Sequence, residues 1–135
     1  MMYLIDTDVI SRVVKTSPPK ALIDRLSKIP RPLQFTTSIN AAEVYYGACR
    51  VDRREELIRA FEERVLSRLT ILPFDLESAR VFGRLKASLE GRGFPRSEPD
   101  LRIAAIALQH GLTVVTGNVR HFEGIPGLTV ENWLE

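Results

Sequence analysis

The sequence predicts a three-layer α/β/α sandwich with a mostly parallel central sheet, and three observations support this prediction. Short apolar runs that suit buried strands alternate with longer segments of helical periodicity, in the order β-α-α-β-α-α-β-α-α-β-β. Polar residues directly follow several of these runs, as they do where parallel α/β sheets bind ligands. The 135 residues contain no repeat or linker, so we expect residues 1–135 to form a single domain.

Composition narrows the class of protein. Apolar residues at 44% and charged residues at 27% are ordinary values for a globular protein, and a net charge of +2 predicts no general binding of polyanions. The single cysteine, Cys49, excludes an internal disulfide and favours a reducing cytoplasm. No apolar run approaches the roughly 18 residues of a membrane span, and the early acid Asp6 argues against a signal peptide.

The first segment predicts a central parallel strand over Met2–Ile5 with Asp6 at its carboxyl end. A carboxylate in that position has no capping role, and burying it without a partner would be costly. We therefore interpret Asp6 as functional. Asp8 is interpreted as the N-cap of a short helix that ends near Val14.

The second unit is predicted to be a helix that starts at Pro18 or Pro19 and ends before Pro30, followed by a strand over Leu33–Thr37. Ser38 is the expected N-cap of the next helix, in which Glu43 lies more than one turn from the cap. Glu43 fits a solvated helix residue as well as a ligand. The apolar residues of this helix form one helical stripe: Ile39, Ala42, Tyr46 and Cys49.

The middle of the chain is predicted to form helices and a strand that support the fold and carry no functional residues. Asp52 to Leu69 reads as an amphipathic helix with a charged, solvated face, and Thr70–Phe74 as a short strand. Asp75 is expected to cap a long helix that reaches Leu89. The glycines and proline that follow predict a loop.

The stretch from Ser97 to Asn118 predicts a helix, a stop and a strand. The helix is apolar on nearly every face, which predicts burial, and Gly111 ends it. The run Leu112–Val115 suits a strand that is covered on both faces. Asp100 lies in the first turn of this helix and also fits a capping box with Ser97. A last strand is predicted near Leu128–Val130, with Trp133 and Leu134 packing it down.

This layout brings the polar groups toward one edge of the sheet. Asp6, Thr116 and Asn118 follow strands, while Glu43 and Asp100 lie on helices that leave or approach the same edge. Three carboxylates at close range cannot all stay ionised unless a cation neutralises them. Because every candidate ligand is an oxygen, Mg²⁺ or Mn²⁺ fits better than zinc. Such a site typically serves phosphate chemistry, in which the ion activates water.

Four separated motifs resemble one family over essentially the whole chain. MYLIDTDVIS, AAEVYYG, DLRIAAIAL and TVVTGNVRHF, in that order, are similar to the PIN-domain ribonucleases, and most of all to the VapC-like toxins of toxin–antitoxin pairs. The resemblance implies a Mg²⁺- or Mn²⁺-dependent endoribonuclease that hydrolyses RNA. It also implies a homodimer and a small antitoxin protein (VapB-like) as inhibitor.

The resemblance also implies roles for individual residues. Asp6, Glu43 and Asp100 match the three metal-binding acids. Asn118 stands where the family often has a fourth acid, and it adds no charge to the site. Thr116 resembles the hydroxyl that supports the pocket, and Asp8 is a further possible support. An antitoxin arginine would pair with the three acids, and the apolar stripes on the first two helices are candidate docking surfaces: Val13, Val14, Leu22 and Leu26.

Two alternatives remain open from the sequence. LIDTDV also fits the nucleophile motif of haloacid-dehalogenase-like phosphatases, in which Asp6 would be phosphorylated. That class needs a later acidic pair, and Thr116-Gly117-Asn118 occupies the corresponding place. The other alternative is a non-catalytic PIN-like binding module, which has no reason to gather three acids.

Overall fold

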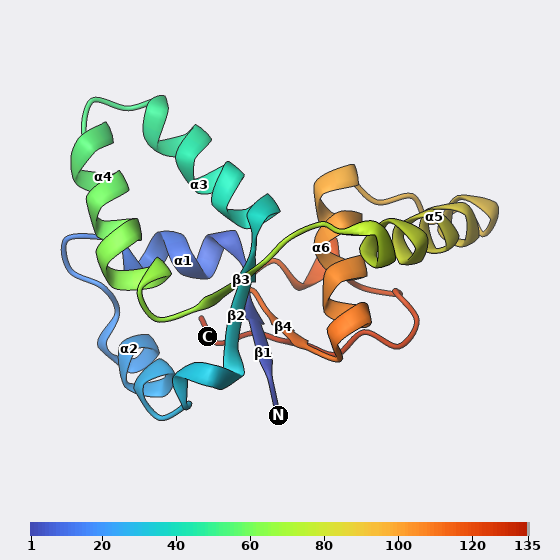
Figure 1. Cartoon of the computed structure of the whole chain (residues 1–135), viewed down its shortest axis with the longest axis horizontal. Coiled ribbons are helices and arrows are strands. Elements are labelled where there is room, and N and C mark those ends of the chain that lie inside the picture. The colour runs from blue at the N-terminus through green and yellow to red at the C-terminus, as the bar shows by residue number, and fades with distance from the viewer. Residues whose placement is uncertain (135) are drawn as a thin grey trace.

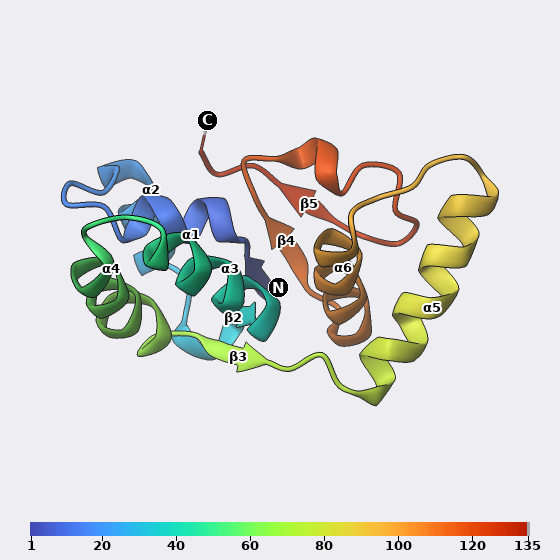
Figure 2. The ribbon, with the colours of Figure 1, turned by 90° about the horizontal axis from the view of Figure 1, so that it is seen from above.

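A computed structural model describes residues 1–134, and it contains a five-stranded, fully parallel sheet between two layers of helices (Figures 1 and 2). The strands lie in the order β3-β2-β1-β4-β5, so the first strand is central, as predicted. The predicted order of elements along the chain is also confirmed. The strands are β1 (Tyr3–Ile5), β2 (Gln34–Thr37), β3 (Thr70–Leu72), β4 (Thr113–Val115) and β5 (Val130–Glu131).

The helices divide between the two faces of the sheet. Residues of α5 and α6 form one core with Leu4 of β1, while α1, α2 and α4 form a second core with Ile5. Consecutive residues of one strand therefore serve opposite faces, because side chains alternate along a strand. The bounds are α1 (Thr7–Val13), α2 (Lys20–Ser27), α3 (Ser38–Cys49), α4 (Arg54–Phe61), α5 (Leu76–Gly91) and α6 (Glu98–His110).

The predictions for α6 and β4 are confirmed. Every residue from Ile103 to Ala107 is buried, and Gly111 ends the helix in the left-handed region at φ +67°. Glycine adopts that conformation without a steric penalty. The residues Leu112–Val115 are buried too, as expected for a strand that is covered on both faces. The most apolar part of the sequence thus forms the buried elements that carry Asp100 and Thr116.

Several predicted boundaries are wrong by one to three residues. Leu33 belongs to a 3₁₀ turn (Arg31–Leu33) that precedes β2, and β3 ends at Leu72, before Pro73, which has no amide N–H to donate. The long helix predicted from Asp52 to Leu69 is α4 followed by a π-helical turn over Glu62–Leu66. Another 3₁₀ turn, Val119–His121, follows β4. These differences do not change which residues reach the carboxyl edge of the sheet.

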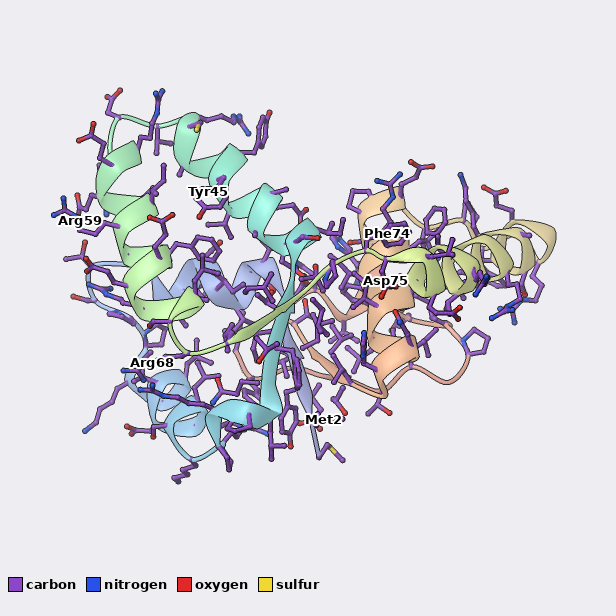
Figure 3. All side chains as sticks on the ribbon, viewed as in Figure 1. Met2, Tyr45, Arg59, Arg68, Phe74 and Asp75 are labelled. Carbon is purple, nitrogen blue, oxygen red and sulfur yellow. The ribbon has the colours of Figure 1, made fainter. Side chains whose placement is uncertain are left out.

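Helix α3 is rotated relative to the prediction. Ala42, Tyr46 and Cys49 are exposed, whereas Asn40 and Ala48 are buried. Tyr45, labelled in Figure 3, faces α4, where its ring lies 5.3 Å from that of Phe61. Of the predicted apolar stripe, only Ile39 packs against a core, and the other three residues face solvent, because the second core takes the neighbouring side of the helix.

Three further expectations can be compared with the structure. Thr37, and not Ser38, is the N-cap of α3, because its Oγ1 accepts the Asn40 N–H. Asp75 caps α5 as predicted, since its carboxylate accepts the Ser78 N–H at 2.9 Å. The stripes on α1 and α2 are core and not free surface, because Val13, Val14 and Leu22 are all buried.

Trp133 is buried against Tyr3, with ring centroids 5.0 Å apart, so the predicted packing of the C-terminal segment is confirmed. Among residues 1–134, no helix is both long enough and apolar enough to cross a membrane.

Candidate active site

Asp6 lies at the junction of β1 and α1, at the carboxyl edge of the sheet. Its N–H donates to the carbonyl of Val115 on β4, and its side chain is buried. Oδ1 accepts a hydrogen bond from Asn40 Nδ2 at 2.9 Å, and Oδ2 accepts one from Thr116 Oγ1 at 2.8 Å. Two strands and two helices therefore fix one carboxylate at the point where β1, β2 and β4 end.

Burial raises the pKa of Asp6 from 3.8 to about 6. The hydrogen bond from Thr116 opposes this shift because it stabilises the ionised form, whereas the nearby carboxylates of Asp8 and Glu43 add to it by repulsion. A cation next to Asp6 would favour the ionised form. Asp6 is thus an acid whose surroundings suit a positively charged ligand.

Glu43 joins Asp6 through one network of hydrogen bonds. Thr7 Oγ1 donates to Glu43 Oε1 at 2.7 Å, and Asn40 Nδ2 donates to Thr7 Oγ1 at 2.9 Å as well as to Asp6. Glu43 itself is exposed, one turn along α3 from the buried Asn40. The α3 helix therefore supplies both the exposed acid and the amide that orients the buried one.

Asn40 is a site residue that the sequence reasoning missed. Its side chain is fully buried, and Thr37 Oγ1 donates to Asn40 Oδ1 at 2.7 Å while accepting the Asn40 N–H at 3.1 Å. This pair leaves the Asn40 amide nitrogen pointing at Asp6. One feature of the sequence could have identified it. Asparagine is a poor helix former, yet Asn40 stands in the first turn of a helix, three residues after Thr37, which can cap that helix.

Asp100 is held on a different element. It lies in the first turn of α6, and its Oδ2 is 3.4 Å from His121 Nδ1. Its backbone N–H donates to Ser97 Oγ, so Ser97 caps the helix as predicted. In a capping box the Asp100 carboxylate would accept the backbone N–H of Ser97. Here it contacts His121 instead.

Thr116 and Asn118 form the turn that follows β4. Thr116 Oγ1 accepts the Asn118 N–H at 3.0 Å, and it is close to two carboxylates, Asp6 at 2.8 Å and Asp8 at 3.2 Å. The side chain of Asn118 is exposed. The expected role of Asp8 as an N-cap is wrong, because Asp6 occupies that position and the Asp8 carboxylate turns toward this loop.

The donor atoms fit a hard divalent cation in kind, but the three predicted ligands are not gathered into one cluster. Within residues 1–134, no three His, Cys, Asp or Glu side chains are arranged so that they could hold a metal ion. Asp6 and Glu43 share a hydrogen-bond network, whereas Asp100 contacts His121. Carboxylate and amide oxygens are nonetheless the ligands that Mg²⁺ and Mn²⁺ prefer.

A groove leads away from this site between α1, α3 and the start of α4. Its volume is about 610 Å³, and Thr7 and Glu43 form one end. Arg53 reaches across the far end, where its Nη2 lies 3.5 Å from Thr16 Oγ1. The remaining lining is mainly apolar or hydroxyl-bearing: Ser11, Val14, Lys15, Ser17, Val44, Gly47, Ala48 and Leu57.

Comparison with known proteins gives consistent matches over the whole chain. The family model described as PIN domain matches residues 3–128. The chain is 37% identical to Ribonuclease VapC2 of Haemophilus influenzae over 99% of both chains, and 32% identical to the tRNA(fMet)-specific endonuclease VapC of Salmonella typhimurium over 98% of both. The fold matches the crystal structure of VapBC2 from Rickettsia felis bound to a DNA fragment from their promoter. That match has a TM-score of 0.88 and 29% identity, and it covers 98% of this chain and 99% of the other.

Proposed function

This chain belongs to the PIN-domain family, and on that premise we propose that Asp6, Glu43 and Asp100 are the ligands of a Mg²⁺ or Mn²⁺ ion that serves RNA cleavage. The chain is a VapC-like endoribonuclease, the toxin of a toxin–antitoxin pair. Ribonucleases of this kind depend on a divalent metal ion. The observation that supports the ligand assignment is the buried Asp6, with its pKa near 6, in one network with Glu43.

Each residue around the proposed metal site has its own role. Asn40 and Thr116 hold the two oxygens of Asp6 with neutral donors, so they leave its negative charge available to a cation. Thr7 orients Glu43. Asp100 lies at the N-terminus of α6, where the helix dipole stabilises a carboxylate. When bound, the ion polarises a phosphoryl oxygen and makes water a better nucleophile at neutral pH.

The alternatives can be separated by experiment. Membership of the PIN family argues against a haloacid-dehalogenase-like phosphatase. We expect the purified chain to cut RNA at internal phosphodiester bonds. Transfer RNA is the first substrate to test, because the Salmonella typhimurium relative is named for tRNA(fMet). A non-catalytic module would leave every RNA intact.

The partners follow from the same premise. We propose a VapB-like antitoxin, a homodimer and a cytoplasmic location, where RNA is available and the single thiol of Cys49 stays reduced. The exposed stripe of α3, which includes Tyr46, is the proposed contact between two copies. Expression of the chain alone should slow growth. Co-expression with the antitoxin should restore growth and yield a soluble complex without nuclease activity.

We propose that the antitoxin lies in the groove between α1, α3 and α4. The groove has an acid at one end and the cations Lys15 and Arg53 among its other lining residues, with an apolar floor between them. An antitoxin segment with an arginine near Glu43 and an acid near Arg53 would complement both ends. The bound arginine would also compete with the metal ion for the carboxylates.

Filling the groove tests this placement. Gly47 lines it, and a Cβ added at this position meets no atom within 4 Å, so Gly47→Leu should fold normally and obstruct the segment. We expect antitoxin binding, measured by calorimetry, to weaken at least about tenfold, which corresponds to about 1.4 kcal/mol. Gly83→Leu on α5 is the matched control, because it also places leucine at an open helical glycine. Equal affinity of both variants would exclude the groove.

A further inference from the structure

Asp8 makes contacts that its expected capping role does not explain. It is the second residue of α1, yet its carboxylate faces the turn that follows β4, more than 100 residues further along the chain. Oδ2 accepts the Gly117 N–H at 2.7 Å, and Oδ1 lies 3.2 Å from Thr116 Oγ1. Asp8 therefore anchors this turn through Oδ2, while its Oδ1 faces the Thr116 hydroxyl.

The anchored turn carries one of the two groups that orient Asp6. Thr116 Oγ1 donates to Asp6 Oδ2 at 2.8 Å, and the Asn118 N–H fixes the same hydroxyl from the other side. A hydroxyl has one proton, so its direction depends on where the backbone of residues 116–118 places it. Any shift of this turn would change the position of the proton that Asp6 receives.

Gly117 allows the close approach of Asp8. A Cβ at this position would lie 2.7 Å from Asp8 Oδ2 and 2.6 Å from Leu134 Cδ1, distances at which atoms must move. The leucine end is flexible, whereas the carboxylate is held in place where it accepts the Gly117 N–H. Glycine is thus the residue that lets the carboxylate reach the backbone N–H.

We propose that Asp8 is a positioning residue for the ribonuclease reaction. It holds the turn of residues 116–118 so that the Thr116 hydroxyl is directed at Asp6, and it acts by accepting the Gly117 N–H and not by binding the metal ion. The inference rests on the proposed function, because it requires Asp6 to take part in cleavage. Misplacement of a reacting group by about 1 Å can cost on the order of 100-fold in rate.

Two substitutions of Asp8 separate positioning from charge. Asp8→Asn keeps an oxygen that can accept the Gly117 N–H, and its amide can donate to Thr116 Oγ1, which leaves the threonine proton for Asp6. Asp8→Ala removes both contacts. We expect Asp8→Ala to lower kcat by about 10- to 100-fold with KM within about threefold of wild type, and Asp8→Asn to keep kcat within about threefold.

The measurements are kcat and KM on a short RNA, at a temperature where circular dichroism shows each variant to be folded. Asp52→Ala serves as the matched control, because Asp52 is an exposed aspartate outside the site. A kcat for Asp8→Ala close to wild type would overturn the proposal. So would an Asp8→Asn variant as impaired as Asp8→Ala, which would mean that the charge matters, or a rise in KM alone, which would mean substrate contact.

A second set of variants disturbs the same contact from the other side. Gly117→Ala in a Leu134→Ala background leaves Asp8 as the obstacle to the new methyl group. We expect this change to lower kcat when Asp8 is present and to have little further effect in Asp8→Ala, because the two sites act through one contact. Independent, additive losses would contradict the proposal. If wild type cleaves no RNA, or Asp6→Asn cleaves it normally, the proposed function fails instead.

Discussion

Asp6→Asn is expected to abolish RNA cleavage while the fold is retained. Loss of a residue that only supports a metal ligand typically costs about 10- to 100-fold, so loss of a ligand itself should exceed about 100-fold. The hydrogen bonds can be satisfied again in the variant. The new Oδ1 would accept from Asn40, and the new amide would donate to Thr116 Oγ1, whose own proton can turn to Asp8 Oδ1, 3.2 Å away.

The same variant should be more stable than wild type at neutral pH when no divalent ion is present. Because the pKa of Asp6 rises from 3.8 to about 6 on folding, the folded protein binds the proton more tightly, and wild-type stability falls as pH increases from about 4 to about 6. The shift corresponds to at most about 3 kcal/mol. Melting temperatures in EDTA should therefore differ by several degrees at pH 7 and converge near pH 4.

Asp52→Asn is the control for both measurements, because it removes an exposed aspartate far from this network. We expect it to cleave RNA like wild type and to show no comparable change with pH. If Asp6→Asn cleaves RNA at a rate near that of wild type, Asp6 is not a ligand of the catalytic ion. If it unfolds at neutral pH, the role of Asp6 is structural.

The parts of the fold that could be predicted from sequence are those that depend on local apolar patterns. The buried α6, the doubly covered β4 and the central β1 each follow from a run of apolar residues with a clear end. Which side of α3 is buried could not be predicted in this way. Its two sides are similarly apolar, and the choice between them depends on α4, which packs against Tyr45 and Val44 from another part of the chain.

The candidate site was predictable to a similar degree. Asp6 stood out because a carboxylate directly after a buried strand has no local purpose. Asn40 and the true partner of Asp8 were missed, because both depend on contacts between segments 34 to 109 positions apart. A local rule such as N-capping considers only the sequence neighbours of Asp8, and it therefore predicted a capping role. The structure shows that a tertiary contact with Gly117 replaces that local role.

Removal of divalent metal is expected to stop cleavage completely, and Mg²⁺ or Mn²⁺ should restore it. The ion should also stabilise the fold, because it binds the native site and not the unfolded chain. At 100 times its dissociation constant, this gain is about 2.7 kcal/mol, which a melting curve resolves easily. Full activity in EDTA would exclude metal dependence.

Asp100→Asn tests whether the third acid belongs to that metal site, although Asp100 contacts His121 in this structure. The Ser97 cap uses the backbone N–H of Asp100, which the substitution keeps, so stability in EDTA should change by less than about 1 kcal/mol. If Asp100 is a ligand, the rise in melting temperature caused by Mn²⁺ should shrink together with cleavage, whereas Asp52→Asn should keep both. A variant that loses cleavage but keeps the full Mn²⁺ effect would place Asp100 on the substrate side of the reaction and not among the ligands of the ion.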